Sequence, residues 1–173
     1  LRTFAEFVEK DLVYRSKKPV YWSIPCRTAL AEAEVEYKDH ISPAVHVKFR
    51  VRGSGGVELG ADACLVIWTT TPWTLPANLA IAVHPRETYA EVLSDGGSYW
   101  VAETLVHSFV EKCGMEHTTI GRKISGSEMV GWVAQHPFIS RESPVLAAEY
   151  VTMDAGTGCV HTAPGHGLDD YLT

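Results

Sequence analysis

The sequence predicts a β-rich mixed α/β domain in which a curled, barrel-like sheet is surrounded by short helices. Short runs with strand patterns recur along most of the chain, and only a few segments have helical spacing. With 173 residues, 46% of them hydrophobic, the chain is large enough to bury the core of one domain. We therefore expect residues 1–173 to form a single domain.

The first part of the chain predicts one helix followed by extended segments. Four apolar residues recur at near-helical spacing between charges, which predicts a helix over residues 3–14. Residues 19–22 have the composition of an extended segment. Residues 28–34 are rich in Ala and Glu and predict a short helical turn.

The middle of the chain carries the strongest strand signals. Apolar and polar residues alternate over 44–52, which predicts a half-buried strand ending at a Gly-rich turn. The apolar run 63–68 is too short for a helix and predicts a strand buried on both faces.

The later elements are expected to be further short strands and one helix. Residues 103–112 predict an amphipathic helix that stops at Gly114. Residues 95–97 predict a hairpin turn between two strands. The strands are expected at 79–83, 88–94, 98–102 and 145–152.

Charge and cysteine usage exclude several classes of function. The formal net charge is −6 and the 15 Lys and Arg residues are dispersed, so the chain alone is expected to bind nucleic acid weakly. The four cysteines are scattered singly, which predicts reduced thiols in a cytosol-like compartment and neither a disulfide framework nor a zinc knuckle. We find no run of eighteen apolar residues and no signal pattern, so no membrane association or secretion is expected.

A threonine run follows the predicted buried strand. Thr69, Thr70 and Thr71 enter a turn that two prolines constrain. Their hydroxyls can bind polar groups of a substrate or hold a water, but they are poor nucleophiles without an adjacent base. Because β-branched threonine also suits a strand end, the pattern leaves a purely structural role open. Trp73 is similarly either a core aromatic or the wall of a pocket.

Two histidines and two aspartates lie within ten residues near the end of the chain. His161, His166, Asp169 and Asp170 invite a metal interpretation. The intervening Pro and Gly residues prevent the regular helical spacing of an H-E-x-x-H site, although a loop site stays open.

Two other interpretations of this segment concern neighbouring residues. Cys159 and His161 are two apart on a predicted strand, so they share a face and resemble a thiol–imidazole pair, but packing is the commoner role for such residues. An aspartate after Gly167 is also a natural helix cap, which accounts for at least one of Asp169 and Asp170.

These two segments closely resemble motifs of the editing domain, also called connective peptide 1, of the isoleucyl-tRNA synthetases, which are class I aminoacyl-tRNA synthetases. The motifs are WTTTPWTLPANLA at 68–80 and GTGCVHTAPGHGLDDY at 156–171. Segments 19–22 and 27–37 look like the family's junction with the synthetic domain, so the resemblance covers nearly the whole chain. The second motif looks closer to the bacterial and organellar branch than to the eukaryotic cytosolic one.

The resemblance is specific within its group. The valyl and leucyl relatives have Arg at the position of Thr71 and lack His at the position of His161. The chain has neither of the two signature motifs of the synthetic domain, so it is not expected to activate amino acids by itself.

The resemblance implies an editing reaction. A hydrophobic pocket distinguishes isoleucine from valine by only about 1–3 kcal/mol, and this pair is itself the known example of that limit. A second site is therefore implied that hydrolyses the ester of valine on isoleucine tRNA, and also valyl-adenylate, while excluding isoleucine by size. The alternatives from other classes are a metal-dependent esterase and a non-catalytic module that binds an amino acid.

The resemblance also assigns roles to individual residues. Asp170 is expected to hold the α-ammonium group of valine, with Asp169 as the helix cap, while His166 stays without a role. Trp73 and His161 are expected to form the walls of the pocket. Thr70 and Thr71 are expected to bind the substrate near its ester or to position the attacking water. Thr69 and Asn78 are expected to be further contacts to the substrate.

The expected partners follow from the same resemblance. They are the 3′ end of isoleucine tRNA carrying valine and the remainder of the synthetase, and neither a cofactor nor a metal is implied. We expect a monomer located in the cytoplasm or in an organellar matrix.

Overall fold

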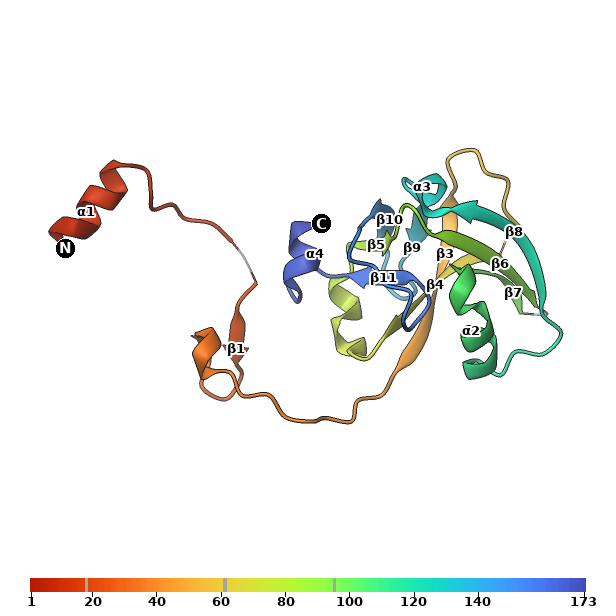
Figure 1. Ribbon diagram of the computed structural model, residues 1–173, viewed down its shortest axis with the longest axis horizontal. Coiled ribbons are helices and arrows are strands. Elements are labelled where there is room, and N and C mark those ends of the chain that lie inside the picture. Colours follow the sequence, from red (N-terminus) through yellow and green to blue (C-terminus); the bar gives the residue numbers. More distant parts are fainter. Residues whose placement is uncertain (18, 61, 95) are drawn as a thin grey trace. The chain divides into compact units, whose positions relative to one another are not determined.

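Two units make up the chain in the computed structural model, Leu1–Glu36 and Tyr37–Thr173. The structure describes residues 1–17, 19–60, 62–94 and 96–173 (Figure 1). The first unit corresponds to the segment whose sequence looks like a junction with another domain.

The first unit is small. It contains the helix α1 (Arg2–Glu9), a hairpin of β1 (Tyr21–Ser23) and β2 (Thr28–Leu30), and a 3₁₀ turn η1 (Glu32–Glu34). The predicted helix over 3–14 is too long: none of the residues of α1 is buried, and Asp11 has a positive φ of 53°, which ends the helix. The predicted helical turn over 28–34 is half wrong, because its first residues pair with β1.

The second unit is dominated by one mixed sheet of nine strands (Figure 1). The strands are β3 (Val45–Gly53), β4 (Ala63–Thr69), β5 (Ala80–Val83), β6 (Thr88–Ser94), β7 (Gly97–Ala102), β8 (Thr119–Ser125), β9 (Val133–Gln135), β10 (Glu142–Ala147) and β11 (Cys159–Thr162). The helices between them are η2 (Pro72–Ala77), η3 (Glu103–Leu105), α2 (Val106–Lys112), α3 (Gly126–Met129) and α4 (Leu168–Leu172).

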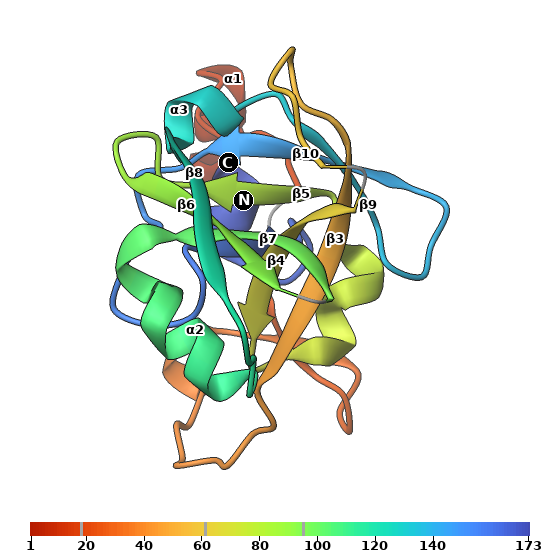
Figure 2. The ribbon, with the colours of Figure 1, turned by 90° about the vertical axis from the view of Figure 1, so that its right-hand side faces the viewer.

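The sheet has the order β11-β5-β10-β9-β3-β4-β7-β6-β8. The pairs β5–β10 and β4–β7 are parallel and the others are antiparallel. The sheet curls so that β11 also packs against β4, and Figure 2 shows β5 and β10 crossing the direction of β3 and β8. The predicted β-rich mixed α/β class is confirmed, but among the described residues β8 and β11 remain unjoined edges, so the curled sheet is not a closed barrel.

The core lies on both faces of β4, as the continuous apolar run predicts. Leu65 and Ile67 belong to the main core inside the curl, where Trp100 and Trp132 meet edge to face. Val66 faces the other way into a smaller cluster that α2 covers with Phe109 (Figure 2). This two-sided burial fixes the position of the strand whose end carries the threonine run.

Most of the other predicted elements are also present. Strands 44–52, 79–83, 88–94 and 98–102 match β3, β5, β6 and β7 within one residue at each end, and 103–112 contains η3 and α2. Ser94 pairs with Gly97, as a two-residue hairpin requires, although residue 95 lies outside the described residues. The strand predicted at 145–152 is only partly correct. It overlaps β10, which begins three residues earlier because Glu142, Ser143 and Pro144 pair with β9, and residues 148–152 lie beyond its end at Ala147, in a turn where Val151 donates its N–H to the Ala148 carbonyl.

None of the helices that the structure describes has the length and apolar character needed to span a lipid bilayer.

Candidate functional site

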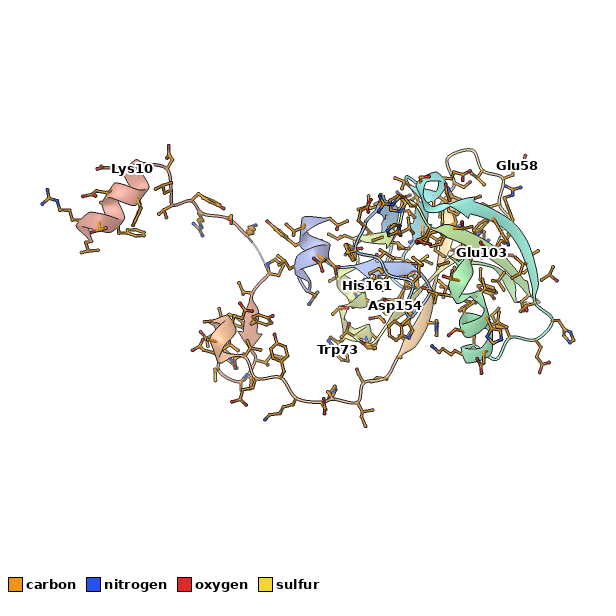
Figure 3. All side chains as sticks on the ribbon, in the orientation of Figure 1. Lys10, Glu58, Trp73, Glu103, Asp154 and His161 are labelled. Carbon is orange, nitrogen blue, oxygen red and sulfur yellow. The ribbon has the colours of Figure 1, made fainter. Side chains whose placement is uncertain are left out.

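A cavity of about 350 Å³ lies where the two motif segments meet. Strand β11 pairs with β5, so that His161 lies opposite Ile81, and Leu79 donates its N–H to the Thr162 carbonyl. This pairing brings the end of β11 beside η2, and Figure 3 shows Trp73 on η2 and His161 on β11. The cavity is lined by Trp68, Thr69, Thr71, Trp73, Thr74, Val160, His161, Ala163, His166 and Asp170.

Both ring nitrogens of His161 are engaged inside the protein. Nδ1 lies 2.8 Å from Asn78 Nδ2, and Nε2 lies 3.0 Å from Thr74 Oγ1. The second hydrogen of Asn78 Nδ2 is donated to the Ala80 carbonyl at 2.8 Å. An amide nitrogen can only donate, so Nδ1 accepts and the ring proton is on Nε2, which donates to Thr74.

Burial reinforces this neutral state of the ring. His161 is 8% exposed, and burial lowers its pKa below the ordinary value of 6.5. The negative charge of Asp170 opposes that shift, whereas His136 and His166 reinforce it. His161 is therefore a neutral wall of the cavity whose lone pair is already in use, and it is not poised to accept a proton from water.

The threonine run is organised by its own hydroxyl groups. Thr71 donates its backbone N–H to Thr69 Oγ1 at 3.1 Å, and the hydroxyls of these two residues lie 3.2 Å apart. Thr74 donates its hydroxyl to the Thr71 carbonyl at 2.8 Å. Two hydroxyl groups, those of Thr69 and Thr71, thus lie together at the cavity, and each keeps a lone pair or a proton for a ligand.

Asp170 brings a carboxylate to the same cavity. It lies in the first turn of α4, and its Oδ2 accepts the Ala163 N–H at 2.9 Å. Ala163 is almost fully buried, so this bond fixes the carboxylate against the end of β11. The other oxygen, Oδ1, has no hydrogen-bond partner among the described residues and is available to a ligand.

Two of the predicted site residues, Asn78 and Thr70, lie away from the cavity lining, and so does Asp169, the expected helix cap. Asn78 is 0% exposed and contacts His161 from behind, where its Oδ1 also accepts the Ser143 hydroxyl at 2.6 Å. Thr70 is exposed, and its carbonyl accepts the Ser42 hydroxyl at 2.6 Å. Asp169 is exposed and makes no side-chain cap for α4, so the expectation that it caps the helix is wrong.

The other predicted residues lie together at the cavity. Thr69, Thr71, Trp73, His161 and Asp170 all line it, although they come from positions up to 101 apart in the numbering. Trp73 is 64% exposed, so it is a wall at the mouth and not a core aromatic.

Sequence reasoning missed two residues of this site. Thr74 bonds the imidazole of His161 and lines the cavity, and Ser143 bonds Asn78 from strand β10. Thr74 lies inside the quoted motif, where its spacing of three from Thr71 in a tight 3₁₀ turn was an available signal. Ser143 lies outside both motifs and carries no local signal.

The two alternative chemistries gain no support from the geometry. The described residues contain no group of three or more His, Cys, Asp and Glu arranged for a metal ion. Cys159 is buried, and burial raises the pKa of its thiol to about 12. Because His161 uses both nitrogens elsewhere, the two residues do not form a thiol–imidazole pair.

A second hollow of about 680 Å³ lies between α2 and the strands β6 and β8. Its lining includes apolar side chains, and its titratable lining residues Glu103, His107, Glu111 and Lys123 are all exposed. Lys123 is also paired with Glu103. Because none of its described lining residues is a buried polar group, this hollow is a weaker candidate for a site than the cavity beside His161.

The sequence matches a described family and its curated members. The family described as tRNA synthetases class I (I, L, M and V) matches residues 1–154. The isoleucine–tRNA ligase of Carboxydothermus hydrogenoformans is 53% identical over 174 residues, which cover 100% of this chain and 18% of the relative. That of Nitratidesulfovibrio vulgaris is 51% identical over 176 residues, covering 99% and 19%. The chain thus spans about a fifth of the length of these relatives.

Two solved structures share the fold. The crystal structure of GlLeuRS-CP1 has a TM-score of 0.63 and 18% identity, over 75% of this chain and 58% of that one. The P. knowlesi cytosolic leucyl-tRNA synthetase editing domain has a TM-score of 0.63 and 17% identity, over 74% and 59%. At such identities the similarity concerns the fold alone, and it agrees with the fold class that the motifs predict.

Proposed function

Because the chain belongs to the class I tRNA synthetases (I, L, M and V), we propose that it is the editing domain of an isoleucyl-tRNA synthetase and hydrolyses the ester of valine mischarged to isoleucine tRNA. One observation carries the proposal: a small cavity holds an available carboxylate oxygen of Asp170, the hydroxyls of Thr69 and Thr71, and a neutral His161. These are the groups that an aminoacyl ester with a free ammonium requires.

Asp170 is the proposed anchor for the α-ammonium group. Its Oδ2 is held by the Ala163 N–H, so the carboxylate is oriented before the ligand arrives, and Oδ1 receives the ammonium. A charge-assisted bond of this kind is about twice as strong as a bond between neutral groups. Among the described lining residues Asp170 is the only carboxylate, so it also decides where the ammonium lies.

His161 and Trp73 are the proposed walls of the size sieve. His161 is buried and bonded at both nitrogens, so it cannot move aside without breaking hydrogen bonds. A volume of about 350 Å³ lies at the lower end of the range for small-molecule sites, about 300–1,000 Å³. A rigid wall in a small cavity admits valine and excludes the extra methylene of isoleucine.

The threonines are the proposed site of hydrolysis. Thr71, with Thr69 beside it, orients a water toward the ester carbonyl, and the exposed Thr70 contacts the ester from the open side. The water oxygen bonds to the carbonyl carbon, the bond to the ribose oxygen breaks, and a water proton passes to that oxygen. Free valine and tRNA with a free terminal hydroxyl are released. Orientation of the water and hydrogen bonds to the developing oxyanion carry this reaction without a covalent nucleophile.

The same acyl group in valyl-adenylate is the proposed second substrate. The remainder of the synthetase is the proposed partner that delivers the 3′ end of the tRNA, because this chain is acidic and its Lys and Arg residues are dispersed along the sequence. For that reason a minimal substrate is needed beside the full tRNA when the chain is tested alone.

The test measures ester hydrolysis by the chain at high protein concentration. Valyl and isoleucyl esters are compared on isoleucine tRNA and on adenosine, each with and without a chelator. We expect the valyl ester to be hydrolysed far faster than the isoleucyl ester, equally with and without the chelator. Loss of activity with the chelator would support a metal-dependent esterase, and valine binding without turnover of either ester would support a binding module.

A further inference from the structure

We propose that Ser143 is a positioning residue of this site: acting through Asn78, it holds the His161 ring in one tautomer and thereby gives the cavity a wall without a free hydrogen-bonding group. The hydrogen-bond assignment stands on the geometry alone, and only its consequence for valine rests on the proposed function. Ser143 lies on β10, outside both motif segments.

The orientation of the Asn78 amide is determined by three neighbours. Ser143 is 0% exposed and donates its hydroxyl to Asn78 Oδ1 at 2.6 Å. On its other side the Asn78 Nδ2 donates to the Ala80 carbonyl and to His161 Nδ1, both at 2.8 Å. A flipped amide would turn its oxygen toward the Ala80 carbonyl, and two acceptors in contact repel each other.

The bond from Asn78 then decides where the His161 proton lies. Nδ1 accepts, so the proton is on Nε2 and is donated to Thr74 Oγ1 at 3.0 Å. Thr74 in turn donates its hydroxyl to the Thr71 carbonyl at 2.8 Å. A directed chain of hydrogen bonds therefore runs from β10 to the threonine run, and each donated hydrogen in it has one acceptor.

The neutral tautomer matters because of what faces the ring. Asp170 lies on α4 and its charge favours a protonated ring, while His136 and His166 disfavour one. A proton on Nδ1 would point at the Asn78 N–H and lose that bond. Ser143, by holding the amide in place, therefore works with burial against the charge of Asp170.

The consequence for the cavity is an apolar wall. With both nitrogens occupied, His161 presents only carbon-bound hydrogens to a ligand, which suits the methyl groups of a small aliphatic side chain. Without the Ser143 hydroxyl, the buried Asn78 Oδ1 loses its hydrogen-bond donor, and the native orientation of the amide loses its advantage over the flipped one. The ring would then sample the other tautomer or the charged form, and the charged form would compete with a ligand ammonium for Asp170.

The first experiment observes the ring nitrogens directly. The chain is labelled with ¹⁵N-histidine, and the two nitrogens of His161 are followed by NMR through a pH titration. We expect wild type to show a protonated Nε2 and an unprotonated Nδ1. In Ser143→Ala the Nδ1 signal moves toward its protonated position and the titration midpoint of His161 rises.

The matched control is Ser98→Ala. Ser98 is also a buried serine on a strand and donates its hydroxyl at 2.6 Å, but its acceptor is Glu91 on β6, outside the site. This variant should leave the His161 signals unchanged. If Ser143→Ala proves too unstable to measure, Ser143→Cys retains a weaker donor of similar size and should give a smaller shift in the same direction.

The second experiment measures discrimination between esters. In Ser143→Ala we expect the ratio of kcat/KM for valyl over isoleucyl ester to fall roughly tenfold, with Ser98→Ala unchanged. Unchanged His161 nitrogens in Ser143→Ala would overturn the proposal whether or not the chain edits. Shifted nitrogens with an unchanged ester ratio would confine the role of Ser143 to structure and overturn its role in the sieve, leaving the proposed hydrolysis intact.

Discussion

Replacing Asp170 by Asn removes one negative charge from the cavity and leaves its surroundings nearly intact. The amide oxygen of Asn can still accept the Ala163 N–H, which Asp170 Oδ2 now accepts at 2.9 Å. Asp170→Ala would instead leave that nearly buried N–H without a partner, and so mix a folding defect with the loss of charge. The Asn variant therefore isolates the electrostatic contribution of the carboxylate.

The size of the effect follows from the exposure of the site. Two unit charges about 4 Å apart attract by about 1 kcal/mol in water and about 4 kcal/mol near a protein surface. Asp170 is partly exposed, which favours the middle of this range. Hydrogen bonds to charged groups are worth about 1.5–3 kcal/mol. We therefore expect Asp170→Asn to lower kcat/KM for the valyl ester by about 10- to 160-fold.

The assay compares two variants on two substrates. Asp169→Asn makes the same chemical change at the next residue, which is exposed and does not line the cavity, and should change kcat/KM by less than about twofold. The second substrate is the ester of the same acyl group without its amino group, which should be hydrolysed equally by wild type and by Asp170→Asn. The anchor role is refuted if Asp170→Asn hydrolyses the valyl ester as wild type does, or if it slows both substrates to the same degree.

Three further predictions concern hydrolysis, stability and pH. Thr71→Ala should slow hydrolysis of the valyl ester roughly tenfold and Thr70→Ala less than about threefold, because only the first residue lines the cavity. Gly158→Ala should lower the free energy of unfolding in urea by about 2–5 kcal/mol, because Gly158 has φ of +73° and an added Cβ would lie 2.4 Å from Ala102 Cβ; an unchanged urea midpoint would contradict this. Burial lowers the His161 pKa below 6.5, so the unfolded chain binds more protons just below that pH. The stability that this histidine contributes is therefore complete above pH 6.5 and is lost as pH falls through the lower folded-state pKa, and His161→Gln should flatten that part of the urea-midpoint profile.

The strands with a strong local pattern could be predicted, and the reason lies in their neighbours. β3 alternates because one face meets the core and the other meets solvent. β4 is apolar throughout because the curled sheet covers one face and α2 covers the other. In both strands the local pattern of apolar residues reflects which faces are buried by long-range packing, so the sequence alone was sufficient to predict these strands.

The elements that the sequence did not predict have no local pattern of apolar residues of this kind. In β8 the first five residues are exposed, and within the described part of the chain the strand pairs with β6 alone, so no apolar alternation is required of it. β9 has three residues, and α3 has four and rests on a local capping interaction between Ser125 and Glu128. These elements depend on partners distant in sequence or on a single cap, and neither produces a periodic pattern.

The candidate site shows the same division. Both motif segments were recognised, and the cavity joins them, yet Asn78 was expected at the ligand and lies behind His161 instead. Its depth follows from β10, since Ser143 reaches Asn78 only because β10 pairs with β5. No feature of the sequence near residue 78 indicates that β10 pairs with β5.

The proposed recognition of an ammonium group depends on the placement of one carboxylate beside a buried neutral histidine. Asp170 favours any nearby positive charge, and the first candidate is the ring of His161 itself. If that ring were protonated, the carboxylate would already be paired and an incoming ammonium would meet a second cation. Burial and the hydrogen bond from Asn78 oppose protonation of the His161 ring at Nδ1, so the ring does not form an ion pair with Asp170. In the proposed function the histidine therefore contributes to ammonium recognition by remaining neutral, and a substitution that places a fixed cation at position 161 should weaken binding of the ester even if the cavity keeps its volume.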